Sequence, residues 1–299
     1  STTKLDAIKR AATARGGGVL RRMRQLFWIS KLAAIRYSPL CFFFVYLPLQ
    51  LLILYDFLIL NILESWQTKY GKYTRAWFIS LGEFEALASF AMLAHDNPDW
   101  AFPELAETAD RLDARQLGHP LLPRATRVAN DVTVGPASSF LLVTGSNMSG
   151  KSTLLRAIGV NAVLAQAGSP VCARFLRMPP VVLATSMRID DSLERGVSYF
   201  MAQLMRLKDI VYLARRSETQ DRKILFYLLD EILQGTNSRE RQIAVVRVLR
   251  HLIDCGALGA VSTHDLELAR AEPLASACVG VYFRETLHDH DAERPMTFD

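Results

Sequence analysis

The 299-residue chain is poor in cysteine, and its cysteines form none of the usual functional patterns. The four of them lie far apart, with no CxxC pair and no cysteine–histidine motif: Cys41, Cys172, Cys255 and Cys278. This spacing argues against a structural zinc site and against a disulfide framework. A reducing, cytoplasmic setting is therefore expected.

The sequence also lacks a secretory leader, an internal repeat and a low-complexity tract. It opens Ser-Thr-Thr without an initiator methionine and stops abruptly three residues after Met296, so we expect an excised piece of a longer protein. Half of the residues are apolar and 22% are charged, which excludes a disordered tail or a disulfide-stapled miniature. One large or two ordinary globular domains are expected.

Acidic residues are scarce near the N-terminus. Residues 1–36 contain one acid, Asp6, against nine lysines and arginines, so this segment carries +8. Because the whole chain carries +5, the remainder sums to −3. A basic surface for nucleic acid or acidic lipid is therefore expected in residues 1–36. Its nine basic residues are Lys4, Lys9, Arg10, Arg15, Arg21, Arg22, Arg24, Lys31 and Arg36.

A long apolar run covers residues 40–60, where 18 of 21 residues are apolar. Its length and hydropathy approach those of a membrane-spanning helix. Pro48, Gln50 and Asp56 interrupt it, however, and a carboxylate near the bilayer centre costs roughly 2.5–3.5 kcal/mol on insertion scales. We therefore expect a buried helix pair broken near Pro48, and contact with a membrane is the alternative.

The pattern of apolar residues in the sequence changes near residue 115. Before it, helical patterns cover residues 4–15, 19–36 and 78–94. After it, short β-branched runs alternate with helical patterns, which is typical of an α/β domain with a largely parallel sheet. We expect an all-helical region, residues 1–114, and an α/β domain, residues 115–299. The predicted strands are residues 140–144, 181–185, 224–229 and 258–262.

A glycine-containing loop follows the first predicted strand. Residues 145–153 fit the P-loop (Walker A) pattern GxxxxGK[ST] between a strand and a helical pattern. Its glycines let successive N–H groups turn toward a phosphate, and the helix N-terminus adds its dipole. Lys151 is expected to contact the β- and γ-phosphates of ATP, and Ser152 to bind Mg²⁺. The predicted nucleotide-binding residues are Gly145, Ser146, Asn147, Met148, Ser149, Gly150, Lys151, Ser152 and Thr153.

Two carboxylates end the apolar run at residues 224–229. Asp230 is expected to hold the Mg²⁺ shell, and Glu231 to polarise the water that attacks the γ-phosphate. The strand predicted at residues 258–262 should lie beside this one and leads to His264, for which we expect a role as γ-phosphate sensor. Glu231 and His264 are thus the predicted catalytic residues.

These motifs together resemble the ATPase domain of the MutS family of DNA mismatch-repair proteins, which belongs to the ABC-type branch of P-loop ATPases. The loop is similar to the family's Gly-Pro-Asn-Met-Gly-Gly-Lys-Ser-Thr, with Ser146 and Ser149 replacing the proline and a glycine. The resemblance covers about residues 115–285 and includes a glutamine segment around Gln166 and a signature segment around residues 190–201. Gln203 stands where the family's signature helix often has glutamate.

The resemblance implies an α/β P-loop ABC-type ATPase domain with a mostly parallel sheet, preceded by an all-α lever and core region. It further implies two such domains facing each other in a homodimer, with Gly196 and Ser198 of one subunit approaching the γ-phosphate held at Lys151 of the other. ATP and Mg²⁺ are the implied cofactors, and Gln166 is a further candidate for metal contact.

The implied function is an ATP-dependent DNA-binding protein of the mismatch-repair type, in which ATP binding and hydrolysis are coupled to a DNA clamp. Duplex DNA, mismatched or structured, is the implied partner. Mismatch reading follows from the resemblance alone and not from these residues. The alternative is a membrane-associated MutS-like or ABC-type ATPase that does not act in mismatch repair. A pseudo-enzyme is disfavoured because all the expected catalytic residues are present.

Overall fold

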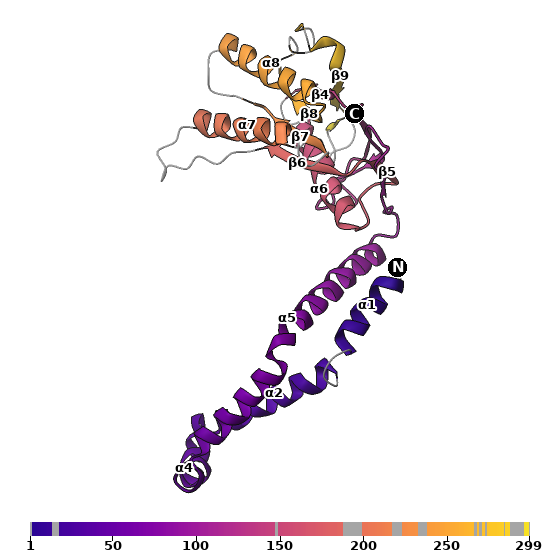
Figure 1. The fold of residues 1–299 in the computed structure, drawn as a ribbon. Coiled ribbons are helices and arrows are strands. Elements are labelled where there is room, and N and C mark those ends of the chain that lie inside the picture. The colour runs from indigo at the N-terminus through magenta and orange to yellow at the C-terminus, as the bar shows by residue number, and fades with distance from the viewer. Residues whose placement is uncertain are drawn as a thin grey trace. The chain divides into compact units, whose positions relative to one another are not determined.

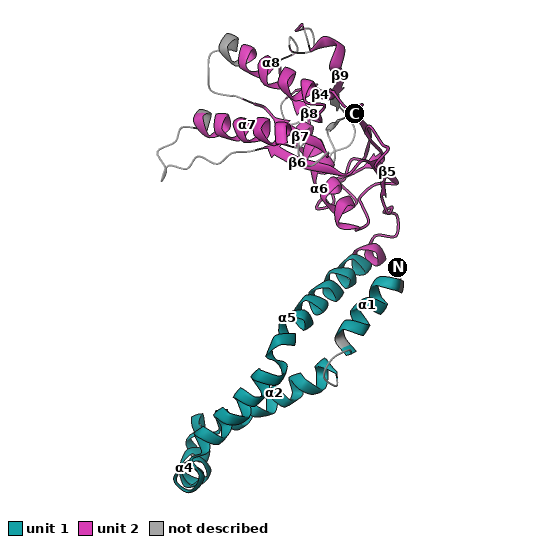
Figure 2. Ribbon diagram, viewed as in Figure 1, with its two compact units in different colours: residues 1–92 teal, residues 93–299 magenta. Residues whose placement is uncertain are grey.

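A computed structural model describes residues 2–13, 18–146, 149–187, 199–216, 223–232, 238–265, 268, 271–272, 274–283, 285–287 and 296–298 (Figure 1). The chain forms two compact units, residues 1–92 and 93–299 (Figure 2). This division falls earlier than the domain boundary expected at residue 115. The reason is that β1 (Glu104–Leu105) and β2 (Leu112–Leu117) pair with a later strand, β5 (Phe175–Met178).

The described part of the first unit is helical throughout. Its longest helix is α5 (Tyr55–Asp96), which runs antiparallel to α2 (Val19–Ala33) (Figure 1). Two contacts show this direction: Tyr55 Oη donates a hydrogen bond to Leu32 O (3.1 Å), and the Arg22 guanidinium lies 4.3 Å from the centroid of the Tyr70 ring. The elements before it are α1 (Thr2–Thr13), α2 (Val19–Ala33), a 3-10 turn (Ala34–Tyr37), α3 (Pro39–Cys41), a π-helical turn (Phe42–Tyr46) and α4 (Leu47–Ile53).

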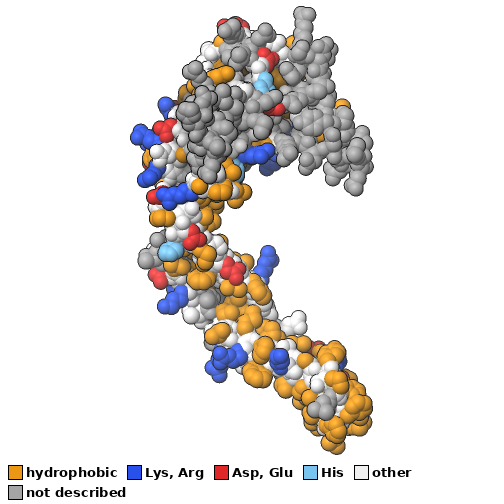
Figure 3. Space-filling model, turned by 180° about the vertical axis from the view of Figure 1, so that it is seen from behind, with side chains coloured by type: hydrophobic (Ala, Val, Ile, Leu, Met, Phe, Trp, Pro, Cys, Tyr) orange, Lys and Arg blue, Asp and Glu red, His pale blue; other side chains and the backbone are white. Residues whose placement is uncertain are grey.

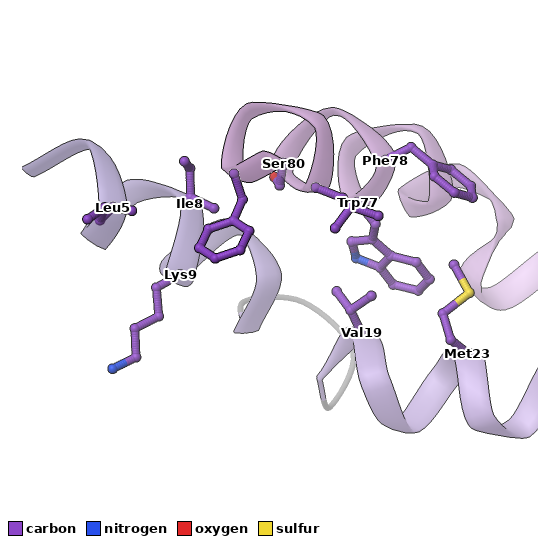
Figure 4. Close-up of a pocket in the computed structure, with 10 residues that line it drawn as sticks. Leu5, Ile8, Lys9, Val19, Met23, Trp77, Phe78 and Ser80 are labelled. Atoms are coloured by element: carbon purple, nitrogen blue, oxygen red, sulfur yellow. The ribbon is translucent and has the colours of Figure 1, made fainter. Parts of the chain in front are cut away.

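Apolar side chains of helix α1 line a groove together with residues of α2 and α5. Ile8 is 8% exposed and Trp77 of α5 is 6% exposed. They lie along a groove of about 640 Å³ whose labelled residues come from α1, α2 and α5 (Figure 4). These residues are Leu5, Ile8, Lys9, Val19, Met23, Trp77, Phe78 and Ser80. The helices predicted at residues 4–15 and 19–36 are therefore present as α1 and α2, and α1 is held by apolar contacts.

The prediction for residues 40–60 is wrong in two respects. The helix breaks at Leu54, whose φ of 50° lies in the left-handed region, whereas Pro48 lies where the π-helical turn continues into α4 and does not break the helix. The stretch is also mostly exposed rather than buried, and Leu51 and Leu52 are 77% and 79% exposed. The helix predicted at residues 78–94 is the end of α5.

Among the described helices, α5 is long and apolar enough, by length and composition alone, to cross a membrane. Residues Val19–Tyr37 and Phe42–Ile53, bent by 103° between them, pass the same test when they are taken as one span. Both findings rest on the length and composition of the helices alone.

The second unit is built on a five-stranded parallel sheet in the order β6-β7-β8-β4-β9, which confirms the predicted α/β class. Each of the four predicted strands is present with bounds within one residue of the prediction. These four are β4 (Ser139–Gly145), β6 (Val181–Ser186), β7 (Ile224–Asp230) and β8 (Leu258–Ser262), and the fifth strand of the sheet is β9 (Cys278–Phe283). A second, mixed sheet has the order β1-β5-β2-β3, with β3 at Asn130–Val134, and β10 (Glu285–Leu287) pairs with β11 (Met296–Phe298).

Helices cover both faces of the parallel sheet. Leu141 and Val143 of β4 belong to the apolar cluster that includes α6 (Lys151–Ala167), whereas Phe140 and Leu142 belong to the cluster of α7 and α8. α7 (Tyr199–Arg216) and α8 (Ser238–Asp254) lie side by side on that face (Figure 1). Because each central strand is buried on both faces, its sequence is continuously apolar rather than alternating.

Candidate active site

The glycine-containing loop connects the carboxyl end of β4 to α6. Gly145 has a φ of 148°, and a Cβ atom there would lie 2.8 Å from the carbonyl oxygen of Phe283. Gly150 has a φ of 93° and is the N-cap of α6. Both conformations are easily reached only by glycine, so the two glycines set the path of the loop. Asn147 and Met148 lie outside the described residues.

Lys151 opens α6 and bends back over the loop that precedes it. Its Nζ donates hydrogen bonds to Gly145 O (2.9 Å) and Ser146 O, and lies 3.4 Å from Ser149 Oγ. The side chain is only 5% exposed, and this burial lowers the pKa of Lys151, while the negative charges of Glu231 and Asp230 oppose the shift. A buried ammonium group held by neutral oxygens is suited to bind an anion such as phosphate.

A hydroxyl and a carboxylate meet where α6 begins and β7 ends. Ser152 Oγ donates a hydrogen bond to Asp230 Oδ1 (3.0 Å), and Ser262 Oγ at the end of β8 donates to the same oxygen. Oxygen donors of this kind are those that Mg²⁺ prefers. No cluster of three or more His, Cys, Asp and Glu side chains in the described part of the chain could hold a metal ion by itself. The Ser152–Asp230 pair therefore fits Mg²⁺ that takes its other ligands from phosphate and water.

Glu231 and His264 form a second pair beside the first. His264 Nε2 lies 2.7 Å from Glu231 Oε1, and donates a hydrogen bond to it when Nε2 carries the proton. Glu231 has a φ of 47°, a left-handed conformation that costs about 1–3 kcal/mol for a residue with a side chain. β7 and β8 are adjacent, as predicted from the sequence. The structure thus brings the two predicted catalytic side chains into contact.

Ser262 also belongs to the candidate site, although the sequence alone predicts no role for it. Its Oγ donates to the Asp230 carboxylate and accepts a hydrogen bond from the Glu231 N–H (3.2 Å), whose other acceptor is Ser262 O (3.2 Å). One serine therefore fixes both acidic residues. A serine at the end of a strand is too common in sequences to reveal this role, and only the pairing of β7 with β8 does so.

The other predicted site residues are placed differently. Thr153 lies exposed in the first turn of α6. Gln166 lies fourteen residues beyond Ser152 on α6, about 21 Å away at the helical rise, and its Oε1 accepts a hydrogen bond from Val181 N (3.0 Å). The structure therefore does not bring Gln166 to the Ser152–Asp230 pair. Gly196 and Ser198 lie outside the described residues.

Comparison with known proteins gives a match to the family model described as MutS domain V over residues 141–292. The chain is 32% identical over 201 residues to "MutS protein homolog 4" of Homo sapiens, covering 66% of this chain and 20% of that protein. It is 36% identical over 200 residues to "DNA mismatch repair protein MutS" of Cereibacter sphaeroides, covering 62% of this chain and 22% of that protein.

It is also 34% identical over 190 residues to "Endonuclease MutS2" of Thermomicrobium roseum, covering 60% of this chain and 23% of that protein. The chain thus spans about a fifth of the length of these relatives. The matched range begins within β4 and contains Lys151, Asp230, Glu231 and His264.

Proposed function

Because the chain belongs to the MutS family, whose domain V model matches half of it, we propose that it is an ATP-dependent DNA-binding protein of the mismatch-repair type. One observation carries this proposal: Lys151, the Ser152–Asp230 pair and the Glu231–His264 pair converge at the carboxyl edge of one parallel sheet. Ligands of open α/β sheets bind at this edge.

Nucleotide binding is assigned to the loop at residues 145–153 and the first turn of α6. Lys151 exchanges its contacts with backbone oxygens for the β- and γ-phosphates of ATP, and the N-terminus of α6 adds its positive dipole end. Ser152 and Asp230 are the residues that would hold Mg²⁺, which when bound neutralises charge on the phosphates.

Hydrolysis is assigned to Glu231 and His264. The Glu231 carboxylate orients a water molecule and accepts its proton. His264 keeps its expected role as γ-phosphate sensor, and its 2.7 Å contact orients the Glu231 carboxylate. Ser262 is assigned a positioning role, because its hydroxyl contacts the Asp230 carboxylate and the Glu231 N–H. The products are ADP and phosphate.

We carry the remaining parts of the mechanism, the dimer and the lever, over from the family to this chain. Two copies face each other, with Gly196 and Ser198 of each completing the nucleotide site of the other, and the helical unit acts as the lever that couples closure to a DNA clamp. Curated relatives named for DNA mismatch repair support a DNA partner for this chain. The second candidate, a membrane-associated ATPase outside mismatch repair, is favoured by the exposed apolar end of the helical unit.

The test is the rate of Mg-ATP hydrolysis by the full-length protein with perfect, mismatched and branched duplex DNA. We expect at least one duplex to change the rate severalfold. DNA binding should weaken roughly 40-fold between 50 and 200 mM salt if three phosphates are contacted. Lys151→Ala should abolish hydrolysis and keep nucleotide-free DNA binding. If no duplex binds and none alters the rate, the DNA assignment fails.

A further inference from the structure

The end of the helical unit formed by residues 42–63, called here the tip, exposes a large apolar surface. Figure 3 shows it as the continuous hydrophobic region at the end of this unit. Leu52 is 79% exposed and Phe44 is 78% exposed. Soluble proteins rarely leave contiguous apolar patches larger than a few hundred Å² uncovered. The other large apolar residues of the tip that are more than 40% exposed are Phe43, Val45, Leu51, Ile53, Leu54, Phe57, Leu58, Leu60 and Ile62.

Several polar groups near the helix break in the tip are bonded to one another. Tyr46 Oη donates a hydrogen bond to Asp56 Oδ2 (2.7 Å), and Asp56 N donates to Gln50 Oε1 (3.0 Å). At the helix break, the N–H groups of Leu54 and Phe57 donate to Gln50 O (3.1 Å) and Leu54 O (2.9 Å). Such internal pairing is what a hydrocarbon medium demands, because it offers no water to satisfy these groups. The bond from Tyr46 therefore reduces the cost of placing the Asp56 carboxylate near lipid.

The apolar end of α5 has the length of one lipid leaflet. From Tyr55 to Leu63 the helix has nine residues, which rise about 13.5 Å, and the hydrocarbon of one leaflet is about 15 Å thick. Polar and charged residues follow at Glu64, Gln67 and Lys69. The tip is therefore long enough to enter one leaflet from its surface and too short to cross both.

A cationic group lies where the tip ends. Arg21, Arg22 and Arg24 of α2 and Lys69 of α5 line one groove together with Trp28 and Trp66, and we call these four cations the collar. Residues 18–72 contain seven lysines and arginines against Asp56 and Glu64, a net charge of +5. Tryptophan and basic side chains just above an apolar segment are typical of the headgroup region.

We propose that the tip inserts into one leaflet of an anionic bilayer and that the collar binds the phosphates of acidic lipid headgroups. Apolar burial supplies the anchoring, and the collar selects the charge of the membrane. A second copy of the chain or a protein partner would cover the apolar surface but would not require acidic lipid, and these occupants are outcomes of the test.

The test is flotation of the full chain with vesicles of phosphatidylcholine, with and without 30% phosphatidylglycerol. The wild type should float with the anionic vesicles, and L51Q/L52Q should lower the bound fraction at least tenfold. The matched control is Leu121→Gln, since Leu121 is an 83% exposed leucine of the other unit and its loss should change nothing. R21Q/R24Q should reduce binding severalfold, whereas K208Q/R247Q, which removes two exposed cations elsewhere, should not.

Three outcomes would overturn the proposal: no flotation of the wild type, equal binding to neutral vesicles, or loss of self-association rather than of lipid binding in L51Q/L52Q. The last outcome, measured by sedimentation, would assign the tip to a second copy. ATP hydrolysis of the same variants without lipid should equal that of the wild type, because the tip lies outside the residues assigned to the nucleotide. The ATPase and membrane proposals can therefore fail separately.

Discussion

At the residue scale, the candidate site depends on backbone conformations and bridging hydroxyls as much as on charged side chains. Glu231 turns out of β7 through a left-handed conformation, and its N–H is held by Ser262. This turn brings its carboxylate against His264. Strained residues of this kind are stable only where their surroundings hold them, and they cluster at functional sites.

His119 gives a pH-dependent test at the same scale. Burial, with the nearby positive charges of Arg156 and Arg127, lowers the pKa of His119, and its Nδ1 accepts a hydrogen bond from Leu121 N (3.3 Å). As the pH falls below about 6.5, the imidazole of His119 is protonated in the unfolded chain but stays neutral in the folded chain. The contribution of neutral His119 to the free energy of unfolding is therefore fully present above about pH 6.5, and it is lost as the pH falls toward the pKa of His119 in the folded chain.

We expect the melting temperature of the wild type to fall more between pH 7.5 and 5.5 than that of His119→Asn, whose amide oxygen keeps the acceptor. The difference should correspond to about 1 kcal/mol, the net value of one hydrogen bond. The exposed His95→Asn is the control and should follow the wild type. Equal pH profiles for His119→Asn and the wild type would contradict the assignment.

The sequence predicts which side chains lie together at the candidate site because the spacing of Lys151, Ser152, Asp230 and Glu231 follows from the requirements of phosphate binding. Lys151 and Ser152 must follow a strand and open a helix, and Asp230 and Glu231 must end a neighbouring buried strand. The 2.7 Å contact of His264 with Glu231 depends on the pairing of β7 with β8, which the apolar run at residues 258–262 indicates only indirectly. The role of Ser262 and the distant place of Gln166 require the structure.

At the element scale, continuous apolar strands were predictable and non-local pairings were not. β4, β7 and β8 are buried on both faces, and the edge strand β6 is partly buried; all four can be recognised from composition. β9 was missed because it is mostly exposed and contains Gly280. The mixed sheet was missed because β2 pairs with β5, which lies more than fifty residues further along the chain.

Tyr227 in β7 provides a stability test for the sheet. Its side chain is fully buried, and its hydroxyl has no hydrogen-bond partner among the described residues. A buried polar group without a partner costs about 1–3 kcal/mol, so Tyr227→Phe should raise the free energy of unfolding by about 1 kcal/mol. This corresponds to a melting temperature about 2–4 °C higher for a unit of this size.

The matched control is Tyr212→Phe on α7, where the side chain is 67% exposed and no change is expected. A melting temperature that falls in Tyr227→Phe would mean that the hydroxyl is bonded in solution, and the account of this part of the core would then be wrong.

At the scale of the whole molecule, charge and apolar surface are divided between the two units. The +8 of residues 1–36 lies in the helical unit, while the remainder of the chain sums to −3 and contains the loop and carboxylates assigned to ATP. Composition alone indicated a mildly basic protein. The structure adds that the collar cations lie next to an exposed apolar tip, which the helical periodicity of residues 40–60 could not reveal.

The central claim is that Glu231 turns a nucleotide-binding site into a hydrolytic one. It is tested most directly by measuring Mg-ATP binding and turnover in the wild type, Glu231→Gln and Lys151→Ala. The wild type should bind and hydrolyse ATP, and Lys151→Ala should do neither. Glu231→Gln should bind ATP while its turnover falls at least ~100-fold, the usual effect of losing a general base. Turnover of Glu231→Gln equal to that of the wild type, or no binding of ATP by the wild type, would contradict the claim.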